Sequence, residues 1–262
     1  MRSRILVLAG LMFAVVPFAR ADEWSKTYTV TGKPDLRVET ADASIRVDTW
    51  DQSTIDVRVT TERYKIGENI KIIEHQNGDS VEIEVRESRH NFVISFGPGR
   101  VEVTVHMPRQ GKVNLHTGDG SITLANFKGD MDLQSGDGHE EIDQVDGTLR
   151  AHTGDGHIRA NGRFDALDIN TGDGRVEARA TAGSTIASSW NIRTGDGGVT
   201  LELPANLAAD VDLHTSDGHI SLDVPVSVEG RLGERSIHGK INGGGNPLTV
   251  HTGDGSIRIE KS

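Results

Sequence analysis

Hydrophobic and polar residues alternate along most of the chain, and this period of two predicts β-strands with one buried face. From residue 111 onward the alternating segments come in pairs. Val113 and Leu115 precede a short polar turn, for example, and Ile122 and Leu124 follow it. The segments are short and strictly alternating, so we expect no long helix. The pattern predicts a repeated unit of strand, turn, strand and polar corner.

The turn of this unit is a tetrapeptide of the form Thr/Ser-Gly-Asp-Gly, and one of its copies has a serine in place of the first glycine. Thr40–Ile45 is a weak early copy. The spacing of the copies is 18, 18, 18, 23, 21 and 37 residues, so we expect a unit near Ser236–Ile241 to have lost its motif. The central aspartates are Asp119, Asp137, Asp155, Asp173, Asp196, Asp217 and Asp254.

Two architectures could use such a unit, namely repeated hairpins in a meander or propeller, or the turns of a stacked coil. A segment of 18 residues at ~3.3 Å each gives about 60 Å of chain, which is one circuit of a narrow coil, whereas a propeller blade needs roughly 40 residues. We therefore expect an all-β fold, a parallel β-solenoid with rungs of about 18 residues. Its inward Val, Ile and Leu side chains would form a continuous thin core.

The last glycine of each tetrapeptide is assigned a structural role in the turn. Glycine accepts a positive φ, and the preceding aspartate can bond its own backbone, so the Asp-Gly step predicts a turn. These turn glycines are Gly120, Gly138, Gly156, Gly174, Gly197, Gly218 and Gly255.

Residues 22–110 lack the tetrapeptide but keep the alternation, and the Asn77-Gly78 step predicts a hairpin. We expect this atypical β region to cap the solenoid of residues 111–262, because an open terminal rung exposes a pairing edge. The strands expected in it are Lys26–Val30, Asp35–Glu39, Ser44–Asp48, Thr54–Thr60, Ile70–Glu74, Ser80–Arg86, Phe92–Phe96 and Arg100–His106.

Residues 1–21 are expected to form a secretory signal peptide. Arg2 and Arg4 precede an apolar stretch over residues 5–18, and Ala19-Arg20-Ala21 is a small-x-small cleavage site. The stretch is too short for a typical membrane span, and no other apolar run approaches that length. We therefore expect an exported protein in the periplasm or outside the cell, with no membrane span.

Composition limits the kinds of partner and site that this chain can have. The 262 residues include 28 basic and 39 acidic side chains, for a net charge of −11, which disfavours nucleic acid or an anionic membrane surface as the main partner. The absence of cysteine excludes disulfides, thiolate metal sites, cysteine nucleophiles and a lipidated N-terminal cysteine.

The signal sequence, the N-terminal β half and the repeated Thr/Ser-Gly-Asp-Gly-x-Ile/Val units resemble a bacterial putative-adhesin family of β-strand-repeat proteins, a domain of unknown function. The resemblance covers roughly residues 30–260. It implies a β-solenoid in the cell envelope or outside the cell. It carries over no catalytic residue, because that family has no established chemistry.

The repeated aspartates are candidate metal ligands. In a regular stack they would lie in one line at about 4.8 Å intervals, and like charges so close repel each other. Turn donors, solvent or a cation must offset this repulsion, and calcium is the natural cation because it takes carboxylate and carbonyl oxygens. The alternative is that each aspartate only shapes its turn, with no cofactor bound. The candidate calcium ladder consists of Asp119, Asp137, Asp155 and Asp173.

Histidines flank most of the tetrapeptides and should point outward, opposite the apolar residues. His139 and His157 hold the same place in successive units and could lie close together, while His152 and His157 bracket one turn. Such a face could bind zinc through imidazole, titrate with acid, or be a solvated polar ladder. The flanking histidines are His116, His139, His152, His157, His214, His219 and His251.

Glu140 and Glu141 are the clear local exception, because Glu140 stands where other units carry Ile122 and Ile158. Some β-helix enzymes cleave acidic polysaccharides with clustered carboxylates, and a glycoside hydrolase needs two acids about 5–10 Å apart. Identical residues in every unit are nevertheless typical of architecture, and the sequence has no nucleophile elbow or phosphate-cradling loop. We therefore expect no enzyme and keep a polysaccharide-active enzyme as the third alternative.

The sequence favours an exported, non-enzymatic module that binds or scaffolds the cell envelope or cell surface, with an unidentified envelope glycan or protein as its partner. A flat surface of stacked polar side chains could hold an extended glycan or another protein's strand edge. The second alternative is a module whose aspartate ladder depends on calcium.

Overall fold

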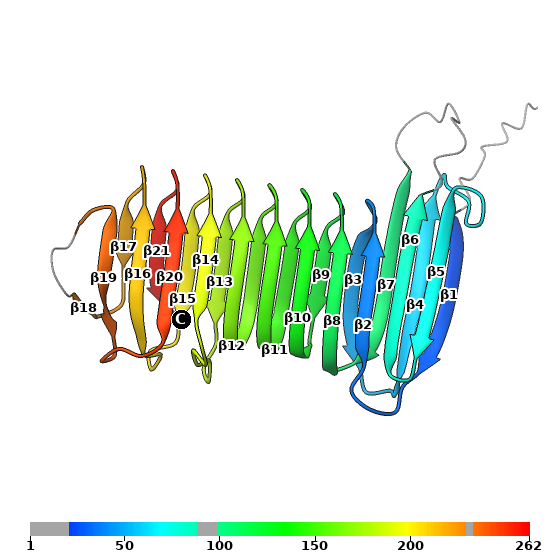
Figure 1. Cartoon of the computed structure of the whole chain (residues 1–262), viewed down its shortest axis with the longest axis horizontal. Helices are drawn as coiled ribbons and strands as arrows, with labels where there is room; N and C mark the ends of the chain where they lie inside the picture. The colour runs from blue at the N-terminus through cyan, green and yellow to red at the C-terminus, as the bar shows by residue number, and fades with distance from the viewer. Residues whose placement is uncertain (1–20, 88–98, 229–232) are drawn as a thin grey trace, which may run out of the picture.

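The computed structural model describes residues 21–87, 99–228 and 233–262, and all the regular elements in these ranges are β-strands (Figure 1). Within them, no helix is long and apolar enough to cross a membrane. Residues 1–20 of the predicted signal peptide and the expected strand Phe92–Phe96 lie outside the described residues. The all-β class predicted from the alternation is confirmed.

The strands that lead into the corners pair in parallel and form one layer, called the first layer below. Along β8, β10 and the second half of β11, each residue lies beside the residue 18 positions away, as Gln110 lies beside Lys128. In spatial order the layer contains β6 (Ser80–Glu87), β2 (Asp35–Thr40), β8 (Gln110–Thr117), β10 (Lys128–Ser135), the second halves of β11 (Glu140–Thr153) and β12 (Ile158–Thr171), β14 (Trp190–Thr194), β20 (Pro247–Thr252) and β16 (Ala209–Thr215).

The strands that leave the corners form the second layer, which is also parallel from β7 to β17. A rung is one strand of the first layer, its corner and the following strand of the second layer. In spatial order the second layer contains β7 (Arg100–Pro108), β3 (Ser44–Trp50), β9 (Ile122–Ala125), the first halves of β11 and β12, β13 (Val176–Ala180), β15 (Val199–Leu203), β21 (Ile257–Lys261) and β17 (Ile220–Leu222).

The core is the thin space between the two layers. Leu115, Leu133 and Ile169 of the first layer face it, as do Ile122 and Val176 of the second layer, and all five are fully buried. Each such side chain contributes about 1.5–3 kcal/mol when it is removed from water. The alternation that predicted these inward positions is confirmed along both layers.

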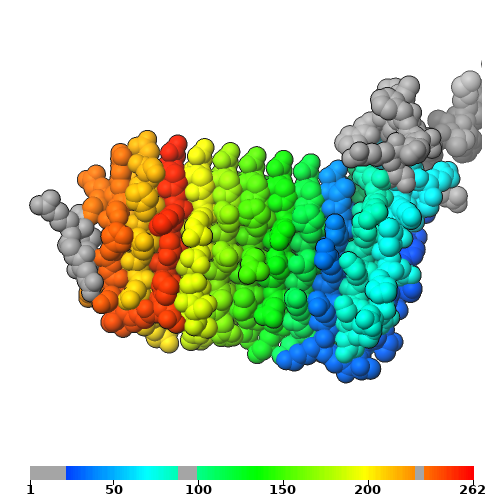
Figure 2. All heavy atoms as spheres, viewed as in Figure 1, coloured from blue at the N-terminus to red at the C-terminus, as the bar shows by residue number. Residues whose placement is uncertain are grey.

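Near the C-terminus the rungs do not follow chain order. The rung of β20 and β21 lies between β14/β15 and β16/β17, although it is the last in the sequence. Figure 2 shows this as a red stripe between yellow and orange stripes. The prediction that Ser236–Ile241 is a rung without its motif is wrong. This segment is β19, which runs antiparallel to β16 beyond the last rung and pairs with β18 (Val226–Val228).

The N-terminal end repeats this out-of-order arrangement. The rung of β2 and β3 lies between β6/β7 and β8/β9, and it uses the predicted early copy as its corner, where the Ala43 N–H donates to Thr40 Oγ1 at 3.2 Å. The predicted hairpin is present, since β5 (Ile70–Asn77) turns into β6 through Gly78 at a φ of 60°.

Antiparallel strands complete this end. β4 (Thr54–Glu62) pairs with β7, and β1 (Ala21–Thr29) pairs with β4, so β1 is the edge of the second layer and β5 that of the first. The two edges meet where Lys26 Nζ lies 2.6 Å from Glu74 Oε1 and the Tyr28 hydroxyl donates to the same carboxylate. Burial, with this hydrogen bond, raises the pKa of Tyr28.

Candidate functional site

A buried hydroxyl joins successive rungs at each corner. Thr153 is fully buried, its Oγ1 donates to the carbonyl of Gly138 at 3.0 Å in the preceding rung, and it accepts the N–H of Gly156 at 3.2 Å in its own turn. The same pattern recurs at the other corners, and Ser135 can replace threonine because only the hydroxyl is used. The first residue of the tetrapeptide therefore links and closes the corner.

The seven turn glycines have a different role from the one predicted. None of them has a φ in the left-handed region, where the sequence placed them. A Cβ on Gly156 would instead lie well under 3.0 Å from the carbonyl oxygen of Gly138, and the same collision recurs at every copy. Glycine is required because the backbones of neighbouring rungs approach too closely for a side chain. These glycines are Gly120, Gly138, Gly156, Gly174, Gly197, Gly218 and Gly255.

The aspartates of the predicted calcium ladder form an exposed ridge along the corners. A Cβ on the first glycine of the next tetrapeptide would lie 3.3 Å from Asp119 Oδ1, so each carboxylate leans over its neighbouring rung. No group of three or more His, Cys, Asp or Glu within the described ranges is arranged to hold a metal ion. Calcium binding remains a prediction for the exposed residues Asp119, Asp137, Asp155 and Asp173.

The flanking histidines point outward as predicted, but on different layers. His116 and His152 precede the corners and lie on the first layer, whereas His139 and His157 follow the corners and lie on the second. The rings of His139 and His157 stack with their centroids 5.1 Å apart and 3° between their planes, as their equivalent places predicted. His152 and His157 bracket a turn, yet the two layers separate them.

Glu140 occupies the core and not an open face. It lies between Ile122 and Ile158, is 1% exposed, and neither carboxyl oxygen has a hydrogen-bond partner among the described residues. Burial raises the pKa of Glu140 well above the usual value, and the charge of Asp132 acts in the same direction. Because the carboxyl group of Glu140 is buried, it cannot contact a polysaccharide on the surface. Glu140 therefore cannot serve as an acid of a polysaccharide-active enzyme.

The outer face of the second layer is hollowed over β11, β12, β13 and β15. One hollow of about 430 Å³ and two adjoining ones share their lining residues, so they form a shallow groove along the stack. Glu141, Arg159 and Glu177 stand side by side on successive rungs in its wall. Arg159 Nη2 lies 2.8 Å from Glu177 Oε2, and Arg175 Nη1 lies 4.0 Å from Glu177 Oε1.

Sequence reasoning did not single out Arg159, Arg175 or Glu177. The alternation shows that each of them points outward, because Ile158, Ala160 and Val176 point inward. The sequence does contain a signal for this pair. Arg159 and Glu177 carry opposite charges, lie at outward positions 18 residues apart, and stand at the same distance after successive tetrapeptides. Sequence alone shows neither this groove nor the separate hollow of about 510 Å³ over β2, β6 and β8 on the first layer.

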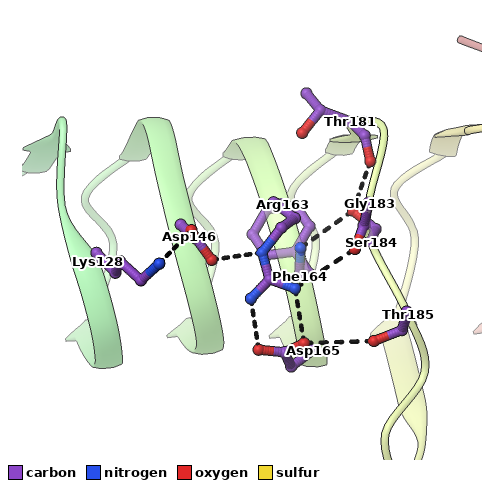
Figure 3. Close-up of polar contacts among 9 residues, drawn as sticks. All are labelled: Lys128, Asp146, Arg163, Phe164, Asp165, Thr181, Gly183, Ser184 and Thr185. Atoms are coloured by element: carbon purple, nitrogen blue, oxygen red, sulfur yellow. Dashed lines mark hydrogen bonds and ion pairs between the residues drawn. The ribbon is translucent and has the colours of Figure 1, made fainter.

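Residues 181–189, called the insertion below, are the long connection from β13 to β14 that lengthens one step of the repeat from 18 to 23 residues, and an arginine network holds it (Figure 3). Arg163 Nη2 lies 2.6 Å from Asp165 Oδ2, Arg163 Nε lies 2.5 Å from Asp146 Oδ1, and Lys128 Nζ contacts Asp146 from the other side at 3.1 Å. The hydrogen bonds from Arg163 lower the pKa of Asp165. Arg163 also donates to the carbonyl of Gly183 at 3.4 Å, so the network ties the insertion to the rungs of β11 and β12.

A model of the family described as Toastrack DUF4097 matches residues 109–260. That range covers more than half of the chain, so the chain belongs to the toastrack family. This assignment confirms the resemblance stated from the sequence. The search of curated proteins finds no match.

Three bacterial proteins are among the solved structures that are similar to this chain. A putative cell adhesion protein from Clostridium sporogenes ATCC 15579 is 16% identical, with 93% of this chain and 100% of that chain covered and a TM-score of 0.43. A putative lipid binding protein from Parabacteroides distasonis ATCC 8503 is 12% identical, with 91% and 96% covered and a TM-score of 0.40. A putative adhesin from Bacteroides fragilis NCTC 9343 is 9% identical, with 92% and 97% covered and a TM-score of 0.31. None of the three is named as an enzyme.

Proposed function

We propose that this toastrack-family chain is an exported, non-enzymatic binding module of the cell envelope or cell surface, and that its binding face is the outer side of the second layer. The observation that carries the proposal is the groove over β11, β12, β13 and β15. Its walls are charged and polar side chains held at the fixed spacing of the rungs. Such a surface suits a long partner laid along the stack better than a small substrate enclosed in a pocket.

We further propose that the stack is a parallel β-solenoid with rungs of about 18 residues and that residues 22–110 cap it. The register of β8, β10, β11 and β12 supports this, because residues 18 positions apart lie side by side over most of these strands. A stack of this kind is a rigid scaffold, since each rung is joined to its neighbours by backbone ladders in both layers. Rigidity preorganises the face and reduces the entropy lost on binding.

The chemistry of the face argues against catalysis. Glu140, the one acid that breaks the repeat, is buried, whereas Glu177 is neutralised by Arg159 and Arg175. General acid catalysis needs a carboxylic acid that can reach the substrate. The groove offers paired charges for binding.

Co-sedimentation of residues 22–262 with isolated cell envelopes, with and without a chelator, tests the function. Saturable binding under both conditions is the expected result. Binding that disappears with the chelator would assign the interaction to the aspartate ridge and calcium. No binding under either condition would contradict an envelope-binding role.

A further inference from the structure

The backbone fixes the protonated nitrogen of two groove histidines. The N–H of His157 donates to Nδ1 of His139 at 3.1 Å, and the N–H of Arg175 donates to Nδ1 of His157 at 2.9 Å. A neutral imidazole has one acceptor nitrogen and one N–H, so a ring that accepts through Nδ1 carries its proton on Nε2. Each rung therefore sets the tautomer of the histidine in the rung before it.

This tautomer makes one wall of the groove a ladder of donors. The centroids of the two parallel rings lie 5.1 Å apart, each ring carries an Nε2–H group, and Arg175 follows at the next rung. A guanidinium has donors and no acceptor. A metal ion needs a free lone pair on its nitrogen ligand, and these two Nε2 atoms carry protons instead. The wall therefore suits oxygen acceptors that repeat at about the spacing of the rungs.

The second wall alternates between acceptors and donors. Glu141, Arg159 and Glu177 lie side by side on three successive strands, and all three line the same hollow as the histidines. Glu141 is exposed, and it forms no hydrogen bond or ion pair with any side chain in the described ranges. Its carboxylate is free to accept hydrogen bonds from a ligand, and next to it Arg159 can donate.

We propose that the groove between the donor ladder (His139, His157 and Arg175) and the mixed wall (Glu141, Arg159 and Glu177) binds a neutral, hydroxyl-rich glycan laid along the stack. A hydroxyl group both accepts and donates, so a polyhydroxylated chain can satisfy both walls at once. This inference rests on the proposed function and names the class of its partner.

Two other occupants fit the groove less well. A polyanion would match the donor ladder, but it would bring its charge against the unpaired carboxylate of Glu141 in a chain whose net charge is −11. An added β-strand needs unpaired backbone groups, which a sheet offers at its edge and not on its face. The groove lies on the face, over strands that are paired on both sides, such as β12 and β13.

The test is a titration of the ¹⁵N-labelled chain, residues 22–262, with cellohexaose, maltohexaose and chitohexaose as neutral probes and hexagalacturonate as an acidic one. We expect at least one neutral hexasaccharide to shift the signals of His139, His157 and Arg175 in a saturable way. The imidazole ¹⁵N shifts of both histidines should show a protonated Nε2. Glu141→Ala should weaken binding about fivefold, the effect of one hydrogen bond of about 1 kcal/mol.

Matched variants on the first layer provide the controls. Asp130→Ala removes an exposed carboxylate from the first layer and is the control for Glu141→Ala. His152→Phe removes an exposed imidazole from the first layer and is the control for His157→Phe on the second. Only the two second-layer variants should weaken binding. Binding of the acidic hexasaccharide alone, binding of none of the four probes, or equal effects on both layers would overturn the inference. Envelope co-sedimentation measured in parallel separates the two proposals, because envelopes can still bind through another ligand when all four probes fail.

Discussion

At the scale of single residues, the corner glycines show how a repeated motif can be recognised while its physical cause is misread. The Asp-Gly step predicted turns at the right places, but the reason given was a positive φ, and none of the seven glycines adopts one. The actual constraint is the neighbouring rung, which the local sequence of one unit does not contain. A requirement that arises only from stacking is invisible until the stack is known.

Substitution of Gly156 by alanine tests this constraint. The new Cβ would meet the backbone carbonyl of Gly138, which cannot rotate away, so we expect a loss of about 3 kcal/mol in the free energy of unfolding. Gly198→Ala is the matched control, because its Cβ would lie 3.4 Å from the carbonyl oxygen of Ser256, an ordinary contact. Chemical denaturation measures both. Equal stabilities would show that the corner is not closely packed.

Glu140 makes the unfolding free energy depend on pH. Its pKa is raised in the folded state by burial, while the unfolded chain ionises near the usual value of about 4.3. Below that pH both states are protonated. As the pH rises, only the unfolded state gains from ionisation, so stability falls until the pH passes the folded-state pKa.

Replacement of Glu140 by isoleucine, the residue at the equivalent position in neighbouring rungs, should therefore stabilise the fold at pH 7. We expect a gain of about 1–3 kcal/mol, the scale of a buried polar group without a partner. Glu140→Gln keeps a polar group but removes the titration, so it should flatten the pH dependence between pH 4 and 7. Thermal melts across this range would contradict the account if wild type and both variants changed in parallel.

At the scale of elements, the alternation predicted the strands well, and all the expected strands that fall within the described ranges are present. Their order in space was not predictable, because the rungs share one pattern and one register. β16 and β20 show the same alternation of apolar and polar residues, so the alternation does not predict which of the two strands lies beside β14. The antiparallel pairing of β19 with β16 determines the order, and that is a long-range contact.

The candidate face was predictable only in part. Alternation places Arg159 and Glu177 outward, but their pairing depends on the 18-residue register between β12 and β13. The hollow depends on the lengths of neighbouring side chains, such as that of Thr200, and so on which rungs lie together. The Nε2–H donors of His139 and His157 depend on backbone groups of the next rung, which the residue type alone does not reveal.

The insertion at residues 181–189 should loosen when its arginine is removed. The N–H of Thr185 donates to the Phe164 carbonyl at 3.0 Å, and the N–H of Ala187 donates to that of Asp165 at 2.8 Å, beside the Arg163 network. We expect Arg163→Met to speed hydrogen exchange at these two amides about tenfold or more. Arg179→Met removes another arginine–carboxylate pair and should leave both amides unchanged. Unchanged exchange in Arg163→Met would show that the backbone alone holds the insertion.

At the scale of the whole molecule, the last rung in the sequence is an internal rung of the stack. Leu248, Val250, Ile257 and Ile259 are buried between two other rungs, and together they account for about 6–12 kcal/mol, comparable with the whole stability of a typical domain. A chain of residues 22–245 would leave a gap between β14/β15 and β16/β17. We expect it to lose cooperative thermal unfolding.

A peptide of residues 246–262 added in trans should restore the cooperative transition, because the place it fills is bounded by strands on both sides. A peptide of the same composition in scrambled order is the control. Circular dichroism melts measure the result. A truncated chain that melts like the full chain without any peptide would contradict the out-of-order arrangement.

The grooved outer face of the second layer is the proposed binding face. Co-sedimentation with envelopes should therefore compare two double variants that leave the net charge unchanged. Each removes one close ion pair between neighbouring rungs together with one longer contact, Arg175–Glu177 at 4.0 Å or Arg150–Asp168 at 3.9 Å. Arg159→Ala with Glu177→Ala alters the groove, and Arg150→Ala with Asp132→Ala removes the equivalent pair, 3.2 Å apart, from the first layer. We expect about tenfold weaker binding for the groove variant and unchanged binding for the first-layer variant. Equal binding by the two variants would show that the groove is not the binding face.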